Sequence, residues 1–182
     1  MLDTYPQERT LYNGHVGENP VTDRWTVTKK HYMLTELVLY GSSQDTSGFT
    51  VKFEAWPKDV FPESEYPPEI HTYGETDQSA KAPIKFTSDL KKIKICVDAY
   101  PAASDIYHDF ENFEFEDQDG VISMPSTGCQ NFMTEDLSEN RLIGFQAVVS
   151  DYRAGRRNIR SLGVIVDRAP YCGDVPFGDA GC

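Results

Sequence analysis

The stretch LIGFQAVVSDYRAGRRNIRSLGVIVD, from Leu142 to Asp167, decides the fold expected for this chain. Apolar side chains alternate with other residues on both sides of its polar centre. They are Ile143, Phe145, Ala147 and Val149 before the centre, and Leu162, Val164 and Val166 after it. Period-two alternation rich in β-branched and aromatic residues is typical of half-buried strands. The centre, residues 151–158, has turn and loop composition, so the stretch predicts a β-hairpin.

The same pattern occurs twice more. Residues 34–56 and 90–117 each contain two alternating apolar runs separated by a polar loop. The three hairpins begin at Leu34, Leu90 and Leu142, at intervals of 56 and 52 residues. Recurrence at nearly fixed spacing indicates a repeated supersecondary unit. Three similar β units can close on themselves and hide their edge strands. No window shows sustained helical spacing of apolar residues, so we expect an all-β fold.

The connecting segments are expected to be mostly irregular. Residues 1–33 are polar, with a short strand around Trp25 to Thr28. Residues 57–83 carry five prolines, and proline removes a ladder donor, which predicts a long loop or insertion with one or two short edge strands. Asp119-Gly120 is a hairpin-turn signal, and residues 125–141 are expected to form a loop.

Length and composition indicate one acidic domain. The chain has 182 residues and a net charge of −12. We divide it into an N-terminal extension (1–11), a β domain with the Pro-rich insertion (12–168) and a Gly/Pro/Cys tail (169–182). The acidity argues against nucleic acid and anionic lipid as partners. No apolar run approaches the ~20 residues of a membrane span, so no membrane insertion is expected. Residues 2–10 lack a secretory-signal pattern, so either the chain is not exported or its numbering begins after processing.

The four cysteines, Cys96, Cys129, Cys172 and Cys182, are candidates for disulfides. None lies in a C-x-x-C pair, which argues against zinc. A Cys172–Cys182 bridge would fix the Gly/Pro-rich tail, whereas four free thiols would suit a reduced cytosolic protein. Cys96 lies inside an alternating strand and is expected to be a small sheet residue rather than a nucleophile. Of the two locations, an extracellular or secretory one is favoured over a cytoplasmic one.

No enzymatic or metal site is expected. The six acids between Asp109 and Asp119 could attract calcium. However, EF-hand spacing is absent, and alternation with Phe113 and Phe115 predicts that Glu114 and Glu116 lie on a solvated face. The four histidines are scattered, and no catalytic motif is present. We therefore expect no catalytic residue, no metal and no cofactor. A hydrolase with two converging carboxylates is the remaining enzymatic alternative.

The three hairpin-bearing units resemble the jacalin-related lectins. IGFQAVV (143–149) and NIRSLGVIV (158–166) resemble that family's closing strand pair, and YNGHVG (12–17) resembles the opening loop of its zymogen-granule-type animal members. LTELVLY (34–40) and LKKIKICV (90–97) resemble the first strands of the middle units. The vitelline outer-layer protein of eggs shares the same prism. The resemblance extends from Tyr12 to Asp167. It implies a pseudo-threefold β-prism of three antiparallel sheets, with a two-sheet β-sandwich as the alternative.

The resemblance also implies sugar binding at one end of the prism. In the family, a glycine-rich opening loop combines with a Gly-x-x-x-Asp loop between the last two strands. Here Gly155 takes the glycine position of that second loop, but Ile159 stands four residues on, followed by Arg160, so the acid is absent. A site without this carboxylate is expected to bind sugars differently or not at all. The opening loop also has fewer glycines than that of the plant members, so close backbone approach to a ligand is less assured.

The residues expected to bind a ligand come from these two loops. They are Gly14, Gly17, Asp151, Tyr152, Arg153, Gly155, Arg156, Arg157 and Asn158. The planar fork of arginine suits carboxylates, sulfates and phosphates, so a sialylated or sulfated glycan or an acidic protein surface would fit. The competing interpretation is that these arginines pair with the chain's own acids. Tyr152 could stack on a sugar ring or pack at the rim.

The sequence thus predicts a non-enzymatic glycan-binding protein. The alternative is a structural component of a filament, coat or large complex, in which the prism forms homo- or hetero-assemblies. The absent acid, the Pro-rich insertion and the Cys-containing tail favour that alternative.

Overall fold

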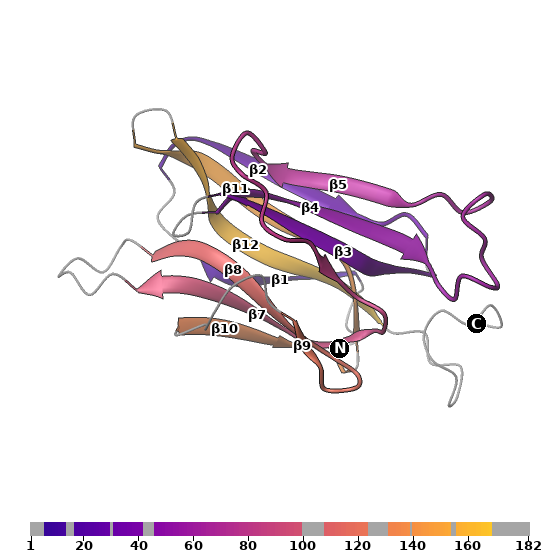
Figure 1. Cartoon of the computed structure of the whole chain (residues 1–182). Coiled ribbons are helices and arrows are strands. Elements are labelled where there is room, and N and C mark those ends of the chain that lie inside the picture. Colours follow the sequence, from indigo (N-terminus) through magenta and orange to yellow (C-terminus); the bar gives the residue numbers. More distant parts are fainter. Residues whose placement is uncertain are drawn as a thin grey trace.

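The computed structural model is all-β in the part of the chain that it describes (Figure 1). The described residues are 6–13, 17–29, 31–41, 46–99, 108–123, 131–138, 140–153 and 156–168. Their strands form three four-stranded antiparallel sheets, which confirms the predicted prism and shows that the two-sheet sandwich is wrong. Within these ranges no helix is long and apolar enough to cross a membrane.

Sheet A joins the two ends of the described chain. Its order is β1 (Gln7–Asn13), β12 (Arg156–Arg168), β11 (Asn140–Arg153) and β2 (Glu18–Thr26). The central hairpin, β11–β12, is the one expected from the opening stretch. The sequence pattern did not indicate β1 or most of β2. Both are edge strands, and the exposed side chains of β2 weaken its apolar alternation.

Sheet B is built on the first hairpin of the sequence. Its order is β5 (Glu69–Gly74), β4 (Thr46–Ala55), β3 (Tyr32–Gly41) and β6 (Ile84–Lys85). The edge strand β5 lies inside the Pro-rich segment, in agreement with the one or two short edge strands expected there. All five prolines of that segment lie outside regular strands, because proline has no N–H to donate to a ladder.

Sheet C is built on the second hairpin. Its order is β10 (Asn131–Asp136), β7 (Leu90–Ala99), β8 (His108–Asp117) and β9 (Ile122–Ser123). The Asp119-Gly120 turn is confirmed: Gly120 has a φ of 78°, and the Asp117 side chain accepts hydrogen bonds from the amides of Asp119 and Val121. The expected loop over 125–141 was wrong, because β10 and the start of β11 lie within it. Few apolar residues mark β10, since it is an edge strand.

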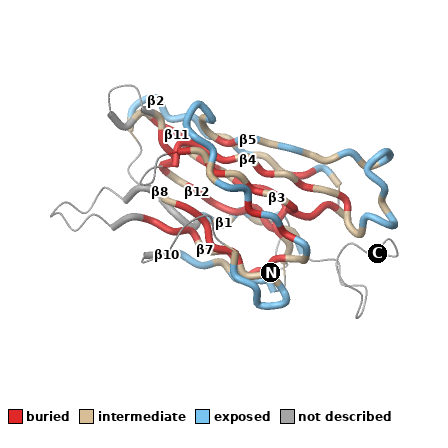
Figure 2. The backbone as a smooth tube through the Cα atoms, viewed as in Figure 1, coloured by how far each residue is buried: buried red, intermediate tan, exposed pale blue. Residues whose placement is uncertain are grey.

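The core lies between the inner faces of the three sheets (Figure 2). Each sheet contributes a phenylalanine to its centre: Phe49 from β4, Phe113 from β8 and Phe145 from β11, all at most 1% exposed. The ring centroids of Phe49 lie 5.3 Å from those of both other rings, and Phe113 and Phe145 are 5.6 Å apart. Such edge-to-face and tilted contacts are favoured by the ring quadrupole. The alternating apolar residues of all three hairpins therefore converge on one core.

The corners of the prism, where two sheets meet, carry polar contacts. Between sheets A and B, the Tyr73 hydroxyl donates to the Trp25 carbonyl at 3.1 Å and accepts from the Phe145 amide at 3.0 Å. Between sheets A and C, Arg9 pairs with Glu135. Between sheets B and C, the Thr46 hydroxyl donates to the Glu111 carbonyl at 2.5 Å. The Tyr73 and Thr46 hydroxyls thereby satisfy backbone groups of the neighbouring sheet.

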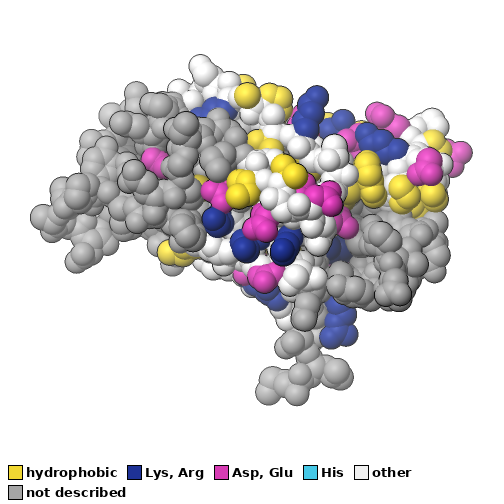
Figure 3. All heavy atoms as spheres, turned by 60° about the horizontal axis from the view of Figure 1, so that its bottom comes forward, with side chains coloured by type: hydrophobic (Ala, Val, Ile, Leu, Met, Phe, Trp, Pro, Cys, Tyr) yellow, Lys and Arg dark blue, Asp and Glu magenta, His cyan; other side chains and the backbone are white. Residues whose placement is uncertain are grey.

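The outer face of sheet C carries charged pairs rather than isolated acids. The Glu114 carboxylate accepts a hydrogen bond from Lys94 Nζ at 2.7 Å, and Glu116 pairs with Lys92 at 3.3 Å. Glu114 is only 9% exposed, so its expected solvation was wrong. Cross-strand attraction between opposite charges is the physical reason. Figure 3 shows basic and acidic side chains next to each other on the face that it brings forward.

Candidate functional site

The candidate site lies at the end of the prism where β11 turns into β12, which we call the tip end (Figure 1). The expected loop was too long: β11 continues to Arg153 and β12 begins at Arg156, with Asp151 paired to Arg157 in the register. Polar composition suggested a loop, but strand pairing satisfies the backbone whatever the side chains are. Most of the predicted binding residues are therefore held by a two-stranded ladder.

Gly17 fixes the start of β2 against this ladder. A Cβ atom at Gly17 would lie 1.9 Å from the Asp151 carbonyl oxygen, so the two backbones approach too closely for any other residue. The Gly17 amide donates to Ser150 Oγ at 2.9 Å, and the Ser150 side chain is fully buried. This donor is therefore used inside the protein. Gly17 shapes the site and does not offer its amide to a ligand.

A polar network of Asn19, Asp151, Arg157 and Glu75 covers the tip end. Asn19 Nδ2 donates to Asp151 Oδ2 at 2.9 Å, and Arg157 Nη2 donates to the Asn19 carbonyl at 3.0 Å. Arg157 Nε lies 3.3 Å from Asp151 Oδ1 and 3.9 Å from Glu75 Oε1. Three separate segments thus bring one cation, two carboxylates and one amide together.

The electrostatics of this network bear on Arg157, the one of the three predicted arginines whose side chain lies in the described part of the structure. Arg157 faces two carboxylates, so its charge is compensated by the chain's own acids, as the competing interpretation held. The Asp151 side chain is 35% exposed and that of Arg157 is 30% exposed. Both groups can therefore exchange hydrogen bonds with a polar ligand while they keep each other oriented.

The remaining predicted residues are placed only in part. Tyr152, Arg153 and Arg156 lie in strands, and their side chains are outside the described part of the structure, as are Gly14 and Gly155 altogether. Asn158 is 6% exposed and therefore belongs to the interior, not to a loop surface. Arg160, which follows the position of the absent family acid, is 1% exposed and likewise lies inside.

Three residues of the site, Asn19, Glu75 and Ser150, were not predicted from the sequence. Asn19 has a φ of 49°, in the left-handed region that asparagine tolerates better than most residues. The Asn19-Pro20 pair was the available signal, since Asn-Pro favours turns. Glu75 gave no signal, because only the packing of sheet B against sheet A brings it to Arg157.

Cys96 lies on the outer face of β7 and is 1% exposed. It takes part in a disulfide, and the other three cysteines of the chain lie outside the described residues. The proposed Cys172–Cys182 bridge lies outside them as well. Among the described residues, no group of three or more His, Cys, Asp and Glu side chains could hold a metal ion.

The arrangement of three four-stranded antiparallel sheets around one core defines a β-prism, and its structural neighbours are jacalin-related lectins. The Calystegia sepium agglutinin matches with a TM-score of 0.57 at 12% identity, over 92% of this chain and 99% of that one. Frutapin from Artocarpus incisa matches with a TM-score of 0.59 at 12% identity, over 91% and 99%. Artocarpin complexed with Me-alpha-mannose matches with a TM-score of 0.59 at 10% identity, over 91% of this chain and 99% of that one.

No family model matches the chain, and no curated protein matches it either. At identities this low the likeness establishes the fold. It gives no support to the filament or coat alternative.

Proposed function

We propose that this protein is a non-enzymatic carbohydrate-binding protein that holds a glycan at its tip end. The observation that carries the proposal is the shared fold: the chain covers nearly the whole length of lectins such as artocarpin, which was solved with Me-alpha-mannose. Fold alone does not assign a function. The polar network at the tip end supplies the second line of support.

The chemistry of the network suits sugar hydroxyls. A hydroxyl is both a donor and an acceptor, so it is best held between a carboxylate oxygen and an N–H group. Asp151 and Glu75 supply carboxylate oxygens, while Asn19 and Arg157 supply N–H groups. Asp151 is thus the group that we propose in place of the acid missing from the Gly-x-x-x-Asp pattern.

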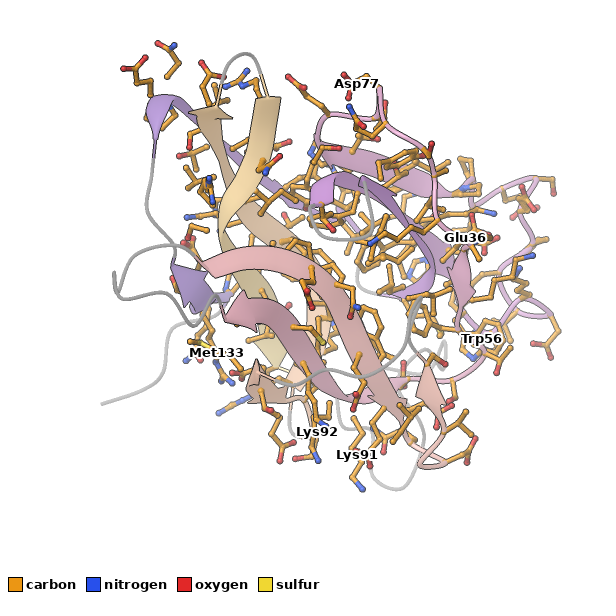
Figure 4. The ribbon with its side chains drawn as sticks, turned by 60° about the vertical axis from the view of Figure 1, so that its left-hand side comes forward. Glu36, Trp56, Asp77, Lys91, Lys92 and Met133 are labelled. Carbon is orange, nitrogen blue, oxygen red and sulfur yellow. The ribbon has the colours of Figure 1, made fainter. Side chains whose placement is uncertain are left out.

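The proposal favours neutral sugars over acidic ones. Arg157 is already paired with Asp151 and Glu75, and a sialic acid or sulfate would have to compete with them. Asp77 lies at the same end of the molecule (Figure 4) and adds a further negative charge there. We therefore expect this surface to bind an anionic glycan more weakly than the three arginines of the hairpin would suggest.

The test is a glycan array that includes mannose oligosaccharides, followed by titration calorimetry with the best ligand. Asp151→Asn removes the carboxylate at nearly constant shape and is expected to weaken binding about 10- to 100-fold, the worth of one hydrogen bond to a charged group. Asp119→Asn makes the same chemical change in the exposed β8–β9 turn and serves as the matched control. A blank array, or equal losses for the two variants, would contradict the proposal.

A further inference from the structure

The segment between β4 and β5, residues 57–68, lies at the end of the prism away from the tip end. Trp56, which precedes it, marks this end in Figure 4. The segment is attached through an aromatic cluster of His31, Tyr32, Phe61 and Tyr66, which we call the clamp. Phe61 and Tyr66 belong to the segment itself, and their ring centroids lie 5.1 Å apart. The Tyr32 hydroxyl also donates to the Pro67 carbonyl at 2.8 Å.

His31 lies at the centre of the clamp. Its ring stacks on Phe61 with centroids 4.1 Å apart and an interplanar angle of 13°, and it meets the edge of Tyr66 at 5.2 Å. Its carbonyl accepts a hydrogen bond from the Trp56 amide at 2.9 Å. The Nε2 atom is buried and has no hydrogen-bond partner in the described structure. The imidazole therefore serves as a flat apolar surface, which suits its neutral form.

The charged groups that face His31 are both cationic. Lys29 Nζ lies over the rings of Tyr32 and Tyr66, at 5.4 and 5.5 Å from their centroids. Arg141 approaches from β11. Burial lowers the pKa of His31, and the charges of Lys29 and Arg141 lower it further. No carboxylate forms an ion pair with His31 among the described residues, so no opposite charge there compensates a proton on this ring.

A second, partly buried group changes charge in the same direction. Asp89 and Asp167 face Arg141, and Arg141 Nη2 lies 3.7 Å from Asp167 Oδ2. Burial raises the pKa of Asp89 to about 6, against the lowering influence of Arg141. Mild acid therefore removes the negative charge of Asp89. The positive charge of Arg141 is then less compensated, at the same pH at which His31 can take up a proton.

We propose that the clamp is an acid-sensitive latch, which holds segment 57–68 against the prism while His31 is neutral and releases it when His31 takes up a proton. Protonation would place a cation against Phe61, with Lys29 and Arg141 as neighbours. When the segment is released, His31 loses the burial that lowers its pKa, so the pKa rises toward its ordinary value of 6.5 and the released state binds the proton more readily. Docking is complete above that value and weakens as the pH falls through it. The docking equilibrium changes about tenfold for each pH unit between the ordinary and the lowered pKa.

The experiment is amide hydrogen exchange of the full chain at pH 7.5 and pH 5.0, corrected for the intrinsic exchange rate at each pH. The amides of Phe61 and Tyr66 report on the segment, because they donate to the carbonyls of Pro57 and Pro62 at 3.0 Å. We expect their protection to fall several-fold at pH 5.0, while the amides of β7 stay protected. An equal fall in β7 would mean global unfolding and would overturn the latch, as would no fall at all.

Variants assign the effect to His31. His31→Phe keeps an aromatic ring and cannot titrate, and His31→Gln removes the titration without adding bulk. Both variants are expected to abolish the pH dependence of the protection of the Phe61 and Tyr66 amides. His71→Asn, at a histidine that pairs with Asp23 at 2.9 Å, is the matched control and is expected to leave it unchanged. If the pH dependence persists in both His31 variants, or is lost in His71→Asn, the proposal is wrong.

Discussion

At the scale of the residue, close backbone approach decides which side chains the tip end can accept. Gly17 is required because β2 and β11 meet there without room for a Cβ atom. Gly120 is a different case, since its φ is +78° but nothing lies within 4 Å of an added Cβ. Gly17 is therefore required by a steric clash, whereas Gly120 is favoured by its backbone conformation alone.

Gly17→Ala is therefore expected to lower the free energy of unfolding by about 2–3 kcal/mol, at the upper end of ordinary substitutions, and to weaken glycan binding by displacing Asn19. Gly120→Ala is expected to cost about 1 kcal/mol, the strain of a left-handed residue, with binding intact. Urea denaturation followed by tryptophan fluorescence measures the free energy of unfolding of both variants. Equal losses in the two variants would refute the steric argument.

At the scale of the element, the structure depends on how neighbouring sheets are joined at the prism corners. Tyr73 is the clearest case, because one hydroxyl from β5 satisfies a carbonyl of β2 and an amide of β11. Burial raises the pKa of Tyr73 far above its usual range, so the hydroxyl remains a donor. Strand β5 contacts β2 through this bond and through His71 Nε2, which lies 2.9 Å from Asp23 Oδ1.

Tyr73→Phe is expected to destabilise the protein by about 1–3 kcal/mol, because the buried Phe145 amide loses its acceptor. Tyr40→Phe removes a hydroxyl from a partly exposed ring in β3 and serves as the control, with an expected change within about 0.5 kcal/mol. Thermal and urea unfolding of both variants provide the measurement. A Tyr73→Phe protein as stable as the control would show that the corner is held in another way.

At the scale of the whole molecule, the three sheets share one core and are expected to unfold together. Phe113→Ala removes one ring of the central triad and is expected to cost about 3–5 kcal/mol. Phe61→Ala removes a ring from the clamp, outside that triad, and is expected to cost clearly less. Denaturant midpoints measure the difference. Similar losses at both positions would argue against a common core formed by the three sheets.

The sequence by itself determined the three hairpins. Their apolar alternation repeats near positions 34, 90 and 142, because each hairpin buries one face, and burial of one face requires period-two alternation. The all-β class, the Asp119-Gly120 turn and the importance of the β11–β12 hairpin all followed from this local pattern. Local pattern also placed Asp151 and Arg157 together, since both belong to one hairpin.

Only the tertiary structure decided the rest. Strands β1, β2 and β10 are edge strands, which bury little and therefore carry little apolar alternation. Asn19 and Glu75 reach Arg157 only because sheets A and B pack against each other, and His31 meets Phe61 only because segment 57–68 folds back onto the prism. Contacts between residues distant in sequence leave no local periodicity. For that reason the hairpins could be predicted, whereas the tip-end network and the clamp required the packed sheets.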